Sequence, residues 1–200
     1  MKFLLAQKVG MSQIFDEAGK MVPVTVLQAN ENRVVGMRNV EKDGYSAYIV
    51  GVNLKKGKDG GKRSDFKKIV EFRTLNDGVA DEFNQDQKIS VEVFNESKEV
   101  KISGVSKGKG FQGVVKRHNF KGGPRTHGHK HNFRQPGSIG STFPMRVIKG
   151  KRMAGRMGSD QVTLRGIKVV NIVLENNTIA LKGAVPGRKG AWIKVLTYEN

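Results

Sequence analysis

The chain has 200 residues and a formal net charge of +18, from 36 Lys and Arg against 18 Asp and Glu. This length suits one domain, and 37% hydrophobic residues are enough for a core. The absence of cysteine excludes disulfides and thiolate metal sites, and it fits a reducing compartment or a protein indifferent to redox conditions. The N-terminus is too polar for a secretory signal, and no stretch approaches the ~20 apolar residues of a membrane helix. We therefore expect a soluble cytoplasmic protein.

The first 54 residues are predicted to form β-structure. β-branched residues dominate Val22–Leu27, a second strand follows at Asn32–Gly36, and a third, Tyr45–Val52, comes after the turn dipeptide Asp43-Gly44.

The next part of the chain divides by charge. Residues 55–70 carry seven Lys and Arg with three glycines, which predicts a small basic loop, with one helical turn near Phe66–Ile69. Residues 71–99 are acidic and contain one predicted strand, Ile89–Phe94.

The basic charge is concentrated in residues 100–159, which contain no Asp or Glu. This window holds fourteen Lys and Arg, all four histidines and twelve of the 25 glycines. A clustered basic segment of this kind is typical of nucleic-acid binding. An anionic membrane is the other common target, but the window is too rich in Gly and Pro for a long amphipathic helix.

Strand patterns resume after the basic window, at Val162–Leu164, Ile167–Leu174, Thr178–Leu181 and Ala191–Leu196, with a hairpin turn at 175–177. Many short strands with frequent turns predict an all-β barrel or sandwich. The simplest organisation is one β-domain, formed by residues 1–99 and 160–200, from which residues 100–159 protrude as a long, basic, mostly irregular extension. Such long irregular segments are usually functional or disordered, and we expect this one to be disordered without its partner.

Gly108–Gly113 satisfies the GxGxxG pattern of nucleotide-binding loops. The dinucleotide interpretation requires an acidic residue about 20 positions later for the ribose, and no acid occurs before Asp160. The kinase interpretation requires catalytic motifs that the chain lacks. The glycines are better explained by close approach of the backbone to a ligand surface. Phe111–His118 is predicted to start a short helix, whose N-terminal amides would face phosphate.

Four histidines, His118, His127, His129 and His131, suggest a metal site. Alternate spacing would place the last three on one side of an extended strand, but the window has no carboxylate or thiolate, and its cations oppose a divalent ion. Acid–base chemistry of the ribonuclease kind needs a pocket that tunes pKa values. We therefore expect no metal, no cofactor and no catalytic residue, and assign the imidazoles to bases, sugars or phosphates.

The remaining hypotheses all involve nucleic acid. Phenylalanines at 111, 120, 133 and 143 alternate with cations, a pattern that suits stacking on unpaired bases. The alternative, strongest for Phe111, is that these rings anchor the segment against its own domain. A structural RNA-binding protein is the leading hypothesis, and an RNA-processing enzyme and a free nucleic-acid chaperone or DNA-binding protein are the alternatives. The candidate RNA-binding residues are Lys8, Lys107, Lys109, Lys116, Arg117, His118, Lys121, Arg125, His127, His129, Lys130, His131, Arg134, Arg146, Lys149, Lys151, Arg152 and Arg156.

Ordered motifs along the chain resemble a known family. They include Lys8–Met11, Ser106–Gly113 with Lys116–His118, Thr126–Gly128, Pro136–Gly140 and Lys182–Gly187. In this order they resemble the bacterial large-subunit ribosomal protein three family over essentially the whole length.

The resemblance implies a translation-protein-type β-barrel and an extension that penetrates large-subunit ribosomal RNA. It also implies early binding during subunit assembly, neighbouring ribosomal proteins as partners, no homo-oligomer, and an extension tip that approaches the peptidyl transferase centre. By motif position that tip comprises Gly137, Ser138, Ile139, Gly140, Ser141, Thr142, Phe143, Pro144 and Met145. Some members carry a methylated glutamine after this motif. None stands here, so we do not expect that modification.

Overall fold

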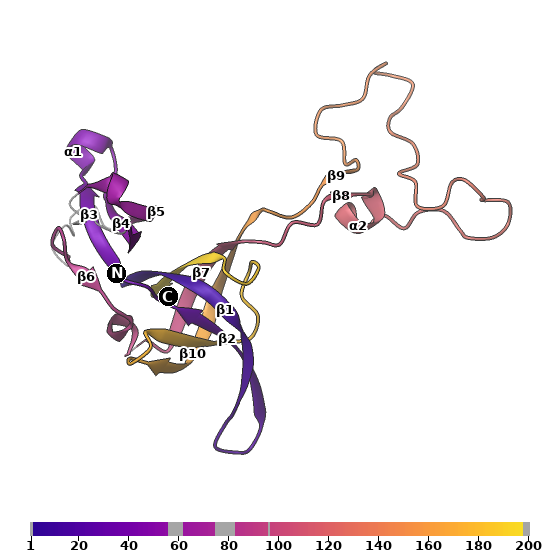
Figure 1. Ribbon diagram of the computed structural model, residues 1–200. Helices are drawn as coiled ribbons and strands as arrows, with labels where there is room; N and C mark the ends of the chain where they lie inside the picture. Colours follow the sequence, from indigo (N-terminus) through magenta and orange to yellow (C-terminus); the bar gives the residue numbers. More distant parts are fainter. Residues whose placement is uncertain (1, 56–61, 75–82, 96, 198–200) are drawn as a thin grey trace. The chain divides into compact units, whose positions relative to one another are not determined.

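The computed structural model describes residues 2–55, 62–74, 83–95 and 97–197. Strands dominate these residues, which confirms the predicted all-β fold (Figure 1). None of the helices in these stretches is long and apolar enough to cross a membrane. The chain divides into two compact units. The first, here called the barrel unit, runs up to Val105 and resumes at Gln161, and the second, the extension, is Ser106–Asp160.

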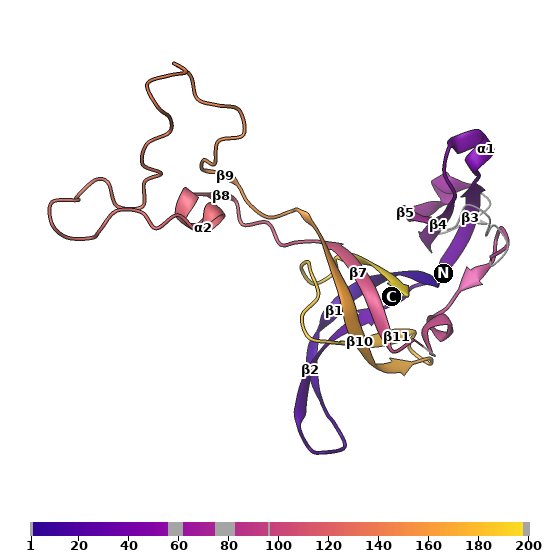
Figure 2. The same cartoon turned by 180° about the vertical axis from the view of Figure 1, so that it is seen from behind.

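Six antiparallel strands close into a barrel in the order β1, β12, β7, β10, β11, β2. Figure 2 shows β7, β10 and β11 side by side. The strands are β1 (Phe3–Phe15), β2 (Met21–Gln28), β7 (Glu99–Val105), β10 (Gln161–Val173), β11 (Thr178–Lys182) and β12 (Trp192–Thr197). Closure gives each strand a hydrogen-bonded neighbour on both sides, which removes the free edges of an open sheet.

A second sheet completes the barrel unit in the order β5, β4, β3, β6. These strands are β3 (Asn32–Arg38), β4 (Ala47–Leu54), β5 (Phe66–Arg73) and β6 (Lys88–Ile89). The helix α1 (Val40–Asp43) joins β3 to β4.

One hydrophobic core is shared by the barrel and the second sheet. The ring of Phe3, on β1, lies 4.8 Å from Phe72, 5.3 Å from Tyr48 and 5.0 Å from Phe83, measured between ring centroids. Successive side chains of a strand point to opposite faces. Burial of four consecutive residues, from Phe3 to Ala6, therefore means that both faces of β1 are covered.

Several predicted strands are confirmed with small changes at their ends: Val22–Leu27 lies in β2, Asn32–Gly36 in β3, Thr178–Leu181 in β11 and Ala191–Leu196 largely in β12. The hairpin at 175–177 is also confirmed, because β10 and β11 pair in antiparallel fashion around it.

Two predictions near the second sheet are wrong. The helical turn at Phe66–Ile69 is instead the start of β5, which pairs with β4 along its length. A single 3-10 turn, Arg63–Asp65, precedes it. The strand predicted at Ile89–Phe94 is a strand only at Lys88–Ile89, and Val91–Phe94 forms a 3-10 helix. Val91 and Phe94 are both buried, since residues three apart eclipse in a 3-10 helix.

The barrel strands differ from expectation at two further points. Two separate strands were expected at Val162–Leu164 and Ile167–Leu174, but β10 is continuous, with an irregularity in register between Leu164 and Ile167. The extension was expected to begin at residue 100, yet β7 continues to Val105 and pairs with both β10 and β12. The stretch without acidic residues therefore begins within β7 of the barrel, before the extension starts.

Candidate nucleic-acid interface

The extension concentrates positive charge on an irregular backbone. Ser106–Asp160 contains thirteen Lys and Arg and four His, with Asp160 as its one acidic residue. Figure 1 shows this unit as a long excursion with little regular structure, interrupted by α2, Val114–His118.

The outgoing and returning segments of the extension pair with each other at its base. The amide of Ser106 donates to the Asp160 carbonyl at 2.9 Å, and the amide of Lys109 donates to the Met157 carbonyl at 2.9 Å. Farther along, β8 (Phe111–Gln112) pairs with β9 (Gly155–Arg156). The extension therefore begins as a narrow stalk of two paired segments before its backbone becomes irregular.

Gly158 shows why this stalk is rich in glycine. Its φ is +78°, and a Cβ at this position would lie 2.2 Å from the carbonyl oxygen of Lys107 on the opposite segment of the stalk. No side chain fits between backbones that lie so close, and a positive φ is itself unfavourable for other residues.

The returning segment of the extension is also hydrogen-bonded to α2. The Arg117 guanidinium donates to the Met153 carbonyl at 2.7 Å, and the His118 Nε2 lies 3.1 Å from the same oxygen. Val114, at the start of α2, is buried. Arg117 and His118, both predicted RNA-binding residues, thus have a structural partner inside the extension.

Most of the predicted RNA-binding side chains are exposed, as phosphate contacts require. His129 is half-buried, and the exposed members of the set are Lys107, Lys109, Lys116, Lys121, Arg125, His127, Lys130, His131, Arg134, Arg146, Lys149, Lys151, Arg152 and Arg156. The Arg125 guanidinium lies 5.2 Å from the centre of the Phe133 ring, which shows a cation and an aromatic ring presented together.

The predicted tip, residues 137–145, is exposed throughout. Phe143 and Met145 are 85% and 92% exposed, far more than apolar side chains inside a protein core. The Ser138 hydroxyl donates to the Gly140 carbonyl at 2.8 Å and closes a local turn. The tip thus presents apolar side chains and small residues between the flanking cations.

Lys8 departs from the predicted set. It is 9% exposed, and its ammonium donates to the carbonyls of Val185, at 2.6 Å, and Gly187, at 3.4 Å. A buried ammonium engaged by backbone oxygens is not available to a phosphate. The prediction that Lys8 binds RNA is therefore replaced by a role inside the barrel unit.

The histidines do not form the extended array that their spacing predicts. His127 has a φ of +58°, and residues 125–134 are mostly turns and bends rather than strand. Among the described residues, no group of three or more His, Cys, Asp or Glu side chains is placed to hold a metal ion.

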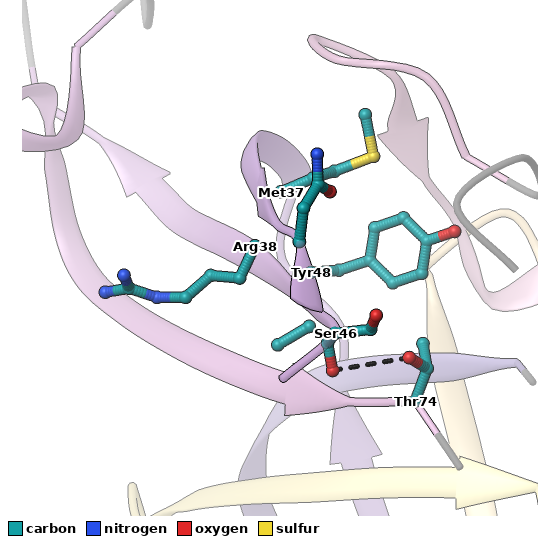
Figure 3. Close-up of a pocket in the computed structure, with 7 residues that line it drawn as sticks. Met37, Arg38, Ser46, Tyr48 and Thr74 are labelled. Atoms are coloured by element: carbon teal, nitrogen blue, oxygen red, sulfur yellow. Dashed lines mark hydrogen bonds between the residues drawn. The ribbon is translucent and has the colours of Figure 1, made fainter. Parts of the chain in front are cut away.

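A small hollow on the second sheet is shown in Figure 3, where Thr74 is hydrogen-bonded to the Ser46 carbonyl. Met37, Arg38 and Tyr48 line it with four other residues. Its volume of about 10 Å³ holds one water at most, so it is no site for a substrate.

Two exposed cations on the barrel unit, Arg188 and Lys189, were not in the predicted set. They lie outside the acid-free window, in a part of the chain where the charge pattern does not single them out. In the sequence the glycines at 183, 187 and 190 indicate a loop with tight turns, and in the structure all three have positive φ.

Comparison with known proteins decides the family of this chain. The family described as Ribosomal protein L3 matches residues 66–177. A large ribosomal subunit protein uL3 from Chloroherpeton thalassium is 45% identical over 210 residues, which cover all of both chains. The chain belongs to the ribosomal protein L3 family.

Other L3 relatives agree along nearly the whole length. The uL3 protein of Alteromonas mediterranea is 43% identical and covers 94% of this chain and 93% of its own. That of Bacillus cytotoxicus is 39% identical and covers 97% of this chain and 95% of its own. Membership of the L3 family makes this chain a structural constituent of the large ribosomal subunit, active in translation, and not an enzyme.

Proposed function

We propose that the extension binds large-subunit ribosomal RNA directly and that its cations neutralise phosphates between packed RNA helices. The observation that carries this proposal is the exposure of fourteen of the eighteen predicted RNA-binding side chains on a narrow backbone. Within the described residues, none of these fourteen exposed side chains has an acidic partner.

The shape of the extension suits the interior of folded RNA. Packed RNA helices leave narrow gaps in which phosphates repel one another, and Lys and Arg relieve that repulsion by releasing bound counterions. The stalk is only two backbone segments wide, and glycines such as Gly158 allow these segments to lie in close contact. A globular domain of equal charge would not enter such gaps.

The tip has a different role in this proposal. Residues 137–145 contain no charged side chain, while Arg134 and Arg146 flank them. Exposed Phe143 and Met145 would pack on bases rather than phosphates, because base faces are apolar and stack on aromatic groups. We place this tip toward the peptidyl transferase centre.

We further propose when the protein binds during assembly of the subunit and where its barrel unit lies. Extensive contact with RNA favours binding early in assembly, before the gaps close. The barrel unit would remain at the subunit surface, beside neighbouring ribosomal proteins, and the assembly would be cytoplasmic.

The first prediction concerns salt. Contact with about eight to twelve phosphates makes log K for ribosomal RNA fall with log salt concentration with a slope of about −6 to −11. Filter binding of the full chain to large-subunit ribosomal RNA between 50 and 300 mM salt, roughly the range over which such slopes are usually determined, measures it. A triple variant, Lys149→Gln, Lys151→Gln and Arg152→Gln, makes the slope less steep by about 2 to 3.

The matched control changes three exposed lysines of the barrel unit, Lys20, Lys42 and Lys67, to Gln, and leaves the slope unchanged. A wild-type slope near zero would contradict the proposal. Sedimentation distinguishes a free nucleic-acid chaperone, because such a protein would not migrate with large subunits at moderate salt.

A further inference from the structure

The loop between β11 and β12, residues 183–191, is held in place by many hydrogen bonds. At its start, the Gly183 amide donates to the Pro23 carbonyl at 2.8 Å and the Thr25 hydroxyl donates to the Gly183 carbonyl at 2.6 Å. At its end, the Gly190 amide donates to the Lys8 carbonyl at 2.7 Å, and the Lys8 amide donates to the Ala191 carbonyl at 2.9 Å.

The buried ammonium of Lys8 fixes the middle of the same loop. Its bonds to the Val185 and Gly187 carbonyls connect β1 to the point where the loop turns. Burial of a charged ammonium is unfavourable unless it is well hydrogen-bonded, so it is an unusual way to hold an ordinary surface loop. The use of a buried ammonium indicates that this loop has to be held in one position.

The loop lies against the end of β7, where the barrel unit gives way to the extension. A Cβ on Gly187, whose φ is +96°, would lie 3.0 Å from the Val105 carbonyl oxygen and 2.8 Å from the Ala191 Cβ. A Cβ on Gly104 would lie 3.6 Å from that of Pro186. Val105 is the last residue of the barrel unit before the extension begins.

Two cations stand at the exposed turn of this loop. The Ala191 amide donates to the Arg188 carbonyl at 3.1 Å, so the turn comprises Arg188–Ala191. The side chains of Arg188 and Lys189 are exposed, and within the described part of the chain no acidic side chain pairs with either. The loop itself contains no Asp or Glu.

We propose that Arg188 and Lys189 form a separate phosphate-binding site for ribosomal RNA on the barrel unit, and that Lys8 is the residue that positions it. This inference rests on the proposed binding of ribosomal RNA. Its ligand is the phosphodiester backbone, because apart from these two cations loop 183–191 contains no polar or aromatic side chain that would contact a base.

The test compares the salt dependence of RNA binding by full-length variants. Each phosphate contact contributes about 0.7 to 0.9 to the slope of log K against log salt concentration. The double variant Arg188→Gln, Lys189→Gln is expected to make the slope less steep by about 1.4 to 1.8. A control pair, Lys20→Gln with Lys42→Gln, removes the same charge from exposed positions of the same unit and leaves the slope unchanged.

Lys8→Met tests positioning, since it removes the ammonium and keeps an apolar chain of similar length. It is expected to make the slope less steep by as much as the double variant does. The triple variant of Lys8→Met, Arg188→Gln and Lys189→Gln is expected to show no further change, because the three residues act as one unit. An additional reduction in the triple variant would contradict the positioning role. If Lys8→Met does not fold, the double variant decides alone.

The outcomes separate the two proposals. An unchanged slope in the double variant, or an equal change in the control pair, overturns the site at Arg188 and Lys189. A wild-type protein that binds ribosomal RNA without salt dependence overturns the proposed function itself.

Discussion

Asn32 is a single buried polar residue that connects the two sheets of the barrel unit. Its Oδ1 accepts from the Leu5 amide at 3.0 Å, and its Nδ2 donates to the Leu5 carbonyl at 3.0 Å and to the Asn30 carbonyl at 2.7 Å. The side-chain amide thus pairs with β1 in the way that the peptide group of a neighbouring strand would. Asn32 lies on β3, so this pairing aligns the second sheet with the barrel.

The replacement Asn32→Ala is expected to destabilise the protein by about 2 to 4 kcal/mol, because the amide and carbonyl of Leu5 lose their partner in a buried place. Urea unfolding monitored by Trp192 fluorescence measures the change. The control Asn171→Ala removes an exposed asparagine from β10 and costs about 0.5 kcal/mol or less. Equal losses in the two variants would show that Asn32 does not have this role.

At the scale of elements, charged groups fasten α1 to the second sheet. The Arg38 guanidinium, on β3, donates to Glu71 on β5 at 3.0 Å and also pairs with Asp43 in α1. The Tyr45 hydroxyl donates to Glu71 at 3.0 Å. The Arg38 guanidinium and the Tyr45 hydroxyl hold the pKa of Glu71 below its ordinary value, and Arg38 lowers the pKa of Asp43 in the same way.

These lowered pKa values predict how the stability of the network depends on pH. A carboxylate with a lowered pKa in the folded state stabilises the protein above its unfolded pKa, and this contribution is lost as pH falls through the folded pKa. Arg38→Gln is therefore expected to be destabilising at pH 7 and to approach the wild type at acid pH, below the ordinary Glu pKa of 4.5.

Urea unfolding at neutral and acid pH measures this convergence. The control Lys67→Gln changes an exposed cation of β5 and shows no such convergence. A difference between Arg38→Gln and the wild type that stays constant with pH would contradict a contribution from these carboxylates.

Strand prediction from the sequence succeeded where burial follows from a local pattern. β2, β3 and β11 are short β-branched runs, and their composition alone indicates strands. β5 was missed because Lys67 and Lys68 made its first half resemble a basic loop, although Phe66 and Phe72 are buried by pairing with β4.

Within the candidate interface, local sequence predicts charge and exposure but not long-range partners. The cations of the extension are recognisable from the acid-free window alone. Lys8 resembled them, yet its partners Val185 and Gly187 lie at the other end of the chain. Only the closed barrel brings these residues together, so no local pattern could have indicated that its ammonium is buried.

At the scale of the whole molecule, the barrel is continuous across the point where the extension leaves it. Val105 of β7 and Gln161 of β10 are paired residues in adjacent antiparallel strands. The ends of the extension are therefore close enough to be joined by a tight turn, and the barrel strands do not depend on it for their pairing.

Deletion of residues 107–159, with Ser106 and Asp160 joined by an Asn-Gly turn, is expected to leave a folded barrel unit whose melting temperature changes by only a few degrees. The deleted protein loses most of the salt dependence of RNA binding and keeps the part due to Arg188 and Lys189. Circular dichroism and filter binding measure these two properties. An unfolded product would show that the extension contributes to the barrel.

The strand order also sets the sequence of events during synthesis. β7 precedes the extension in the chain, but both of its neighbours, β10 and β12, follow it, and β12 comes last. The ring cannot close until the C-terminal strand has left the ribosome that makes it. The cationic extension is therefore complete while β1, β2 and β7 still lack their final partners, so that the barrel closes only after the extension has been made.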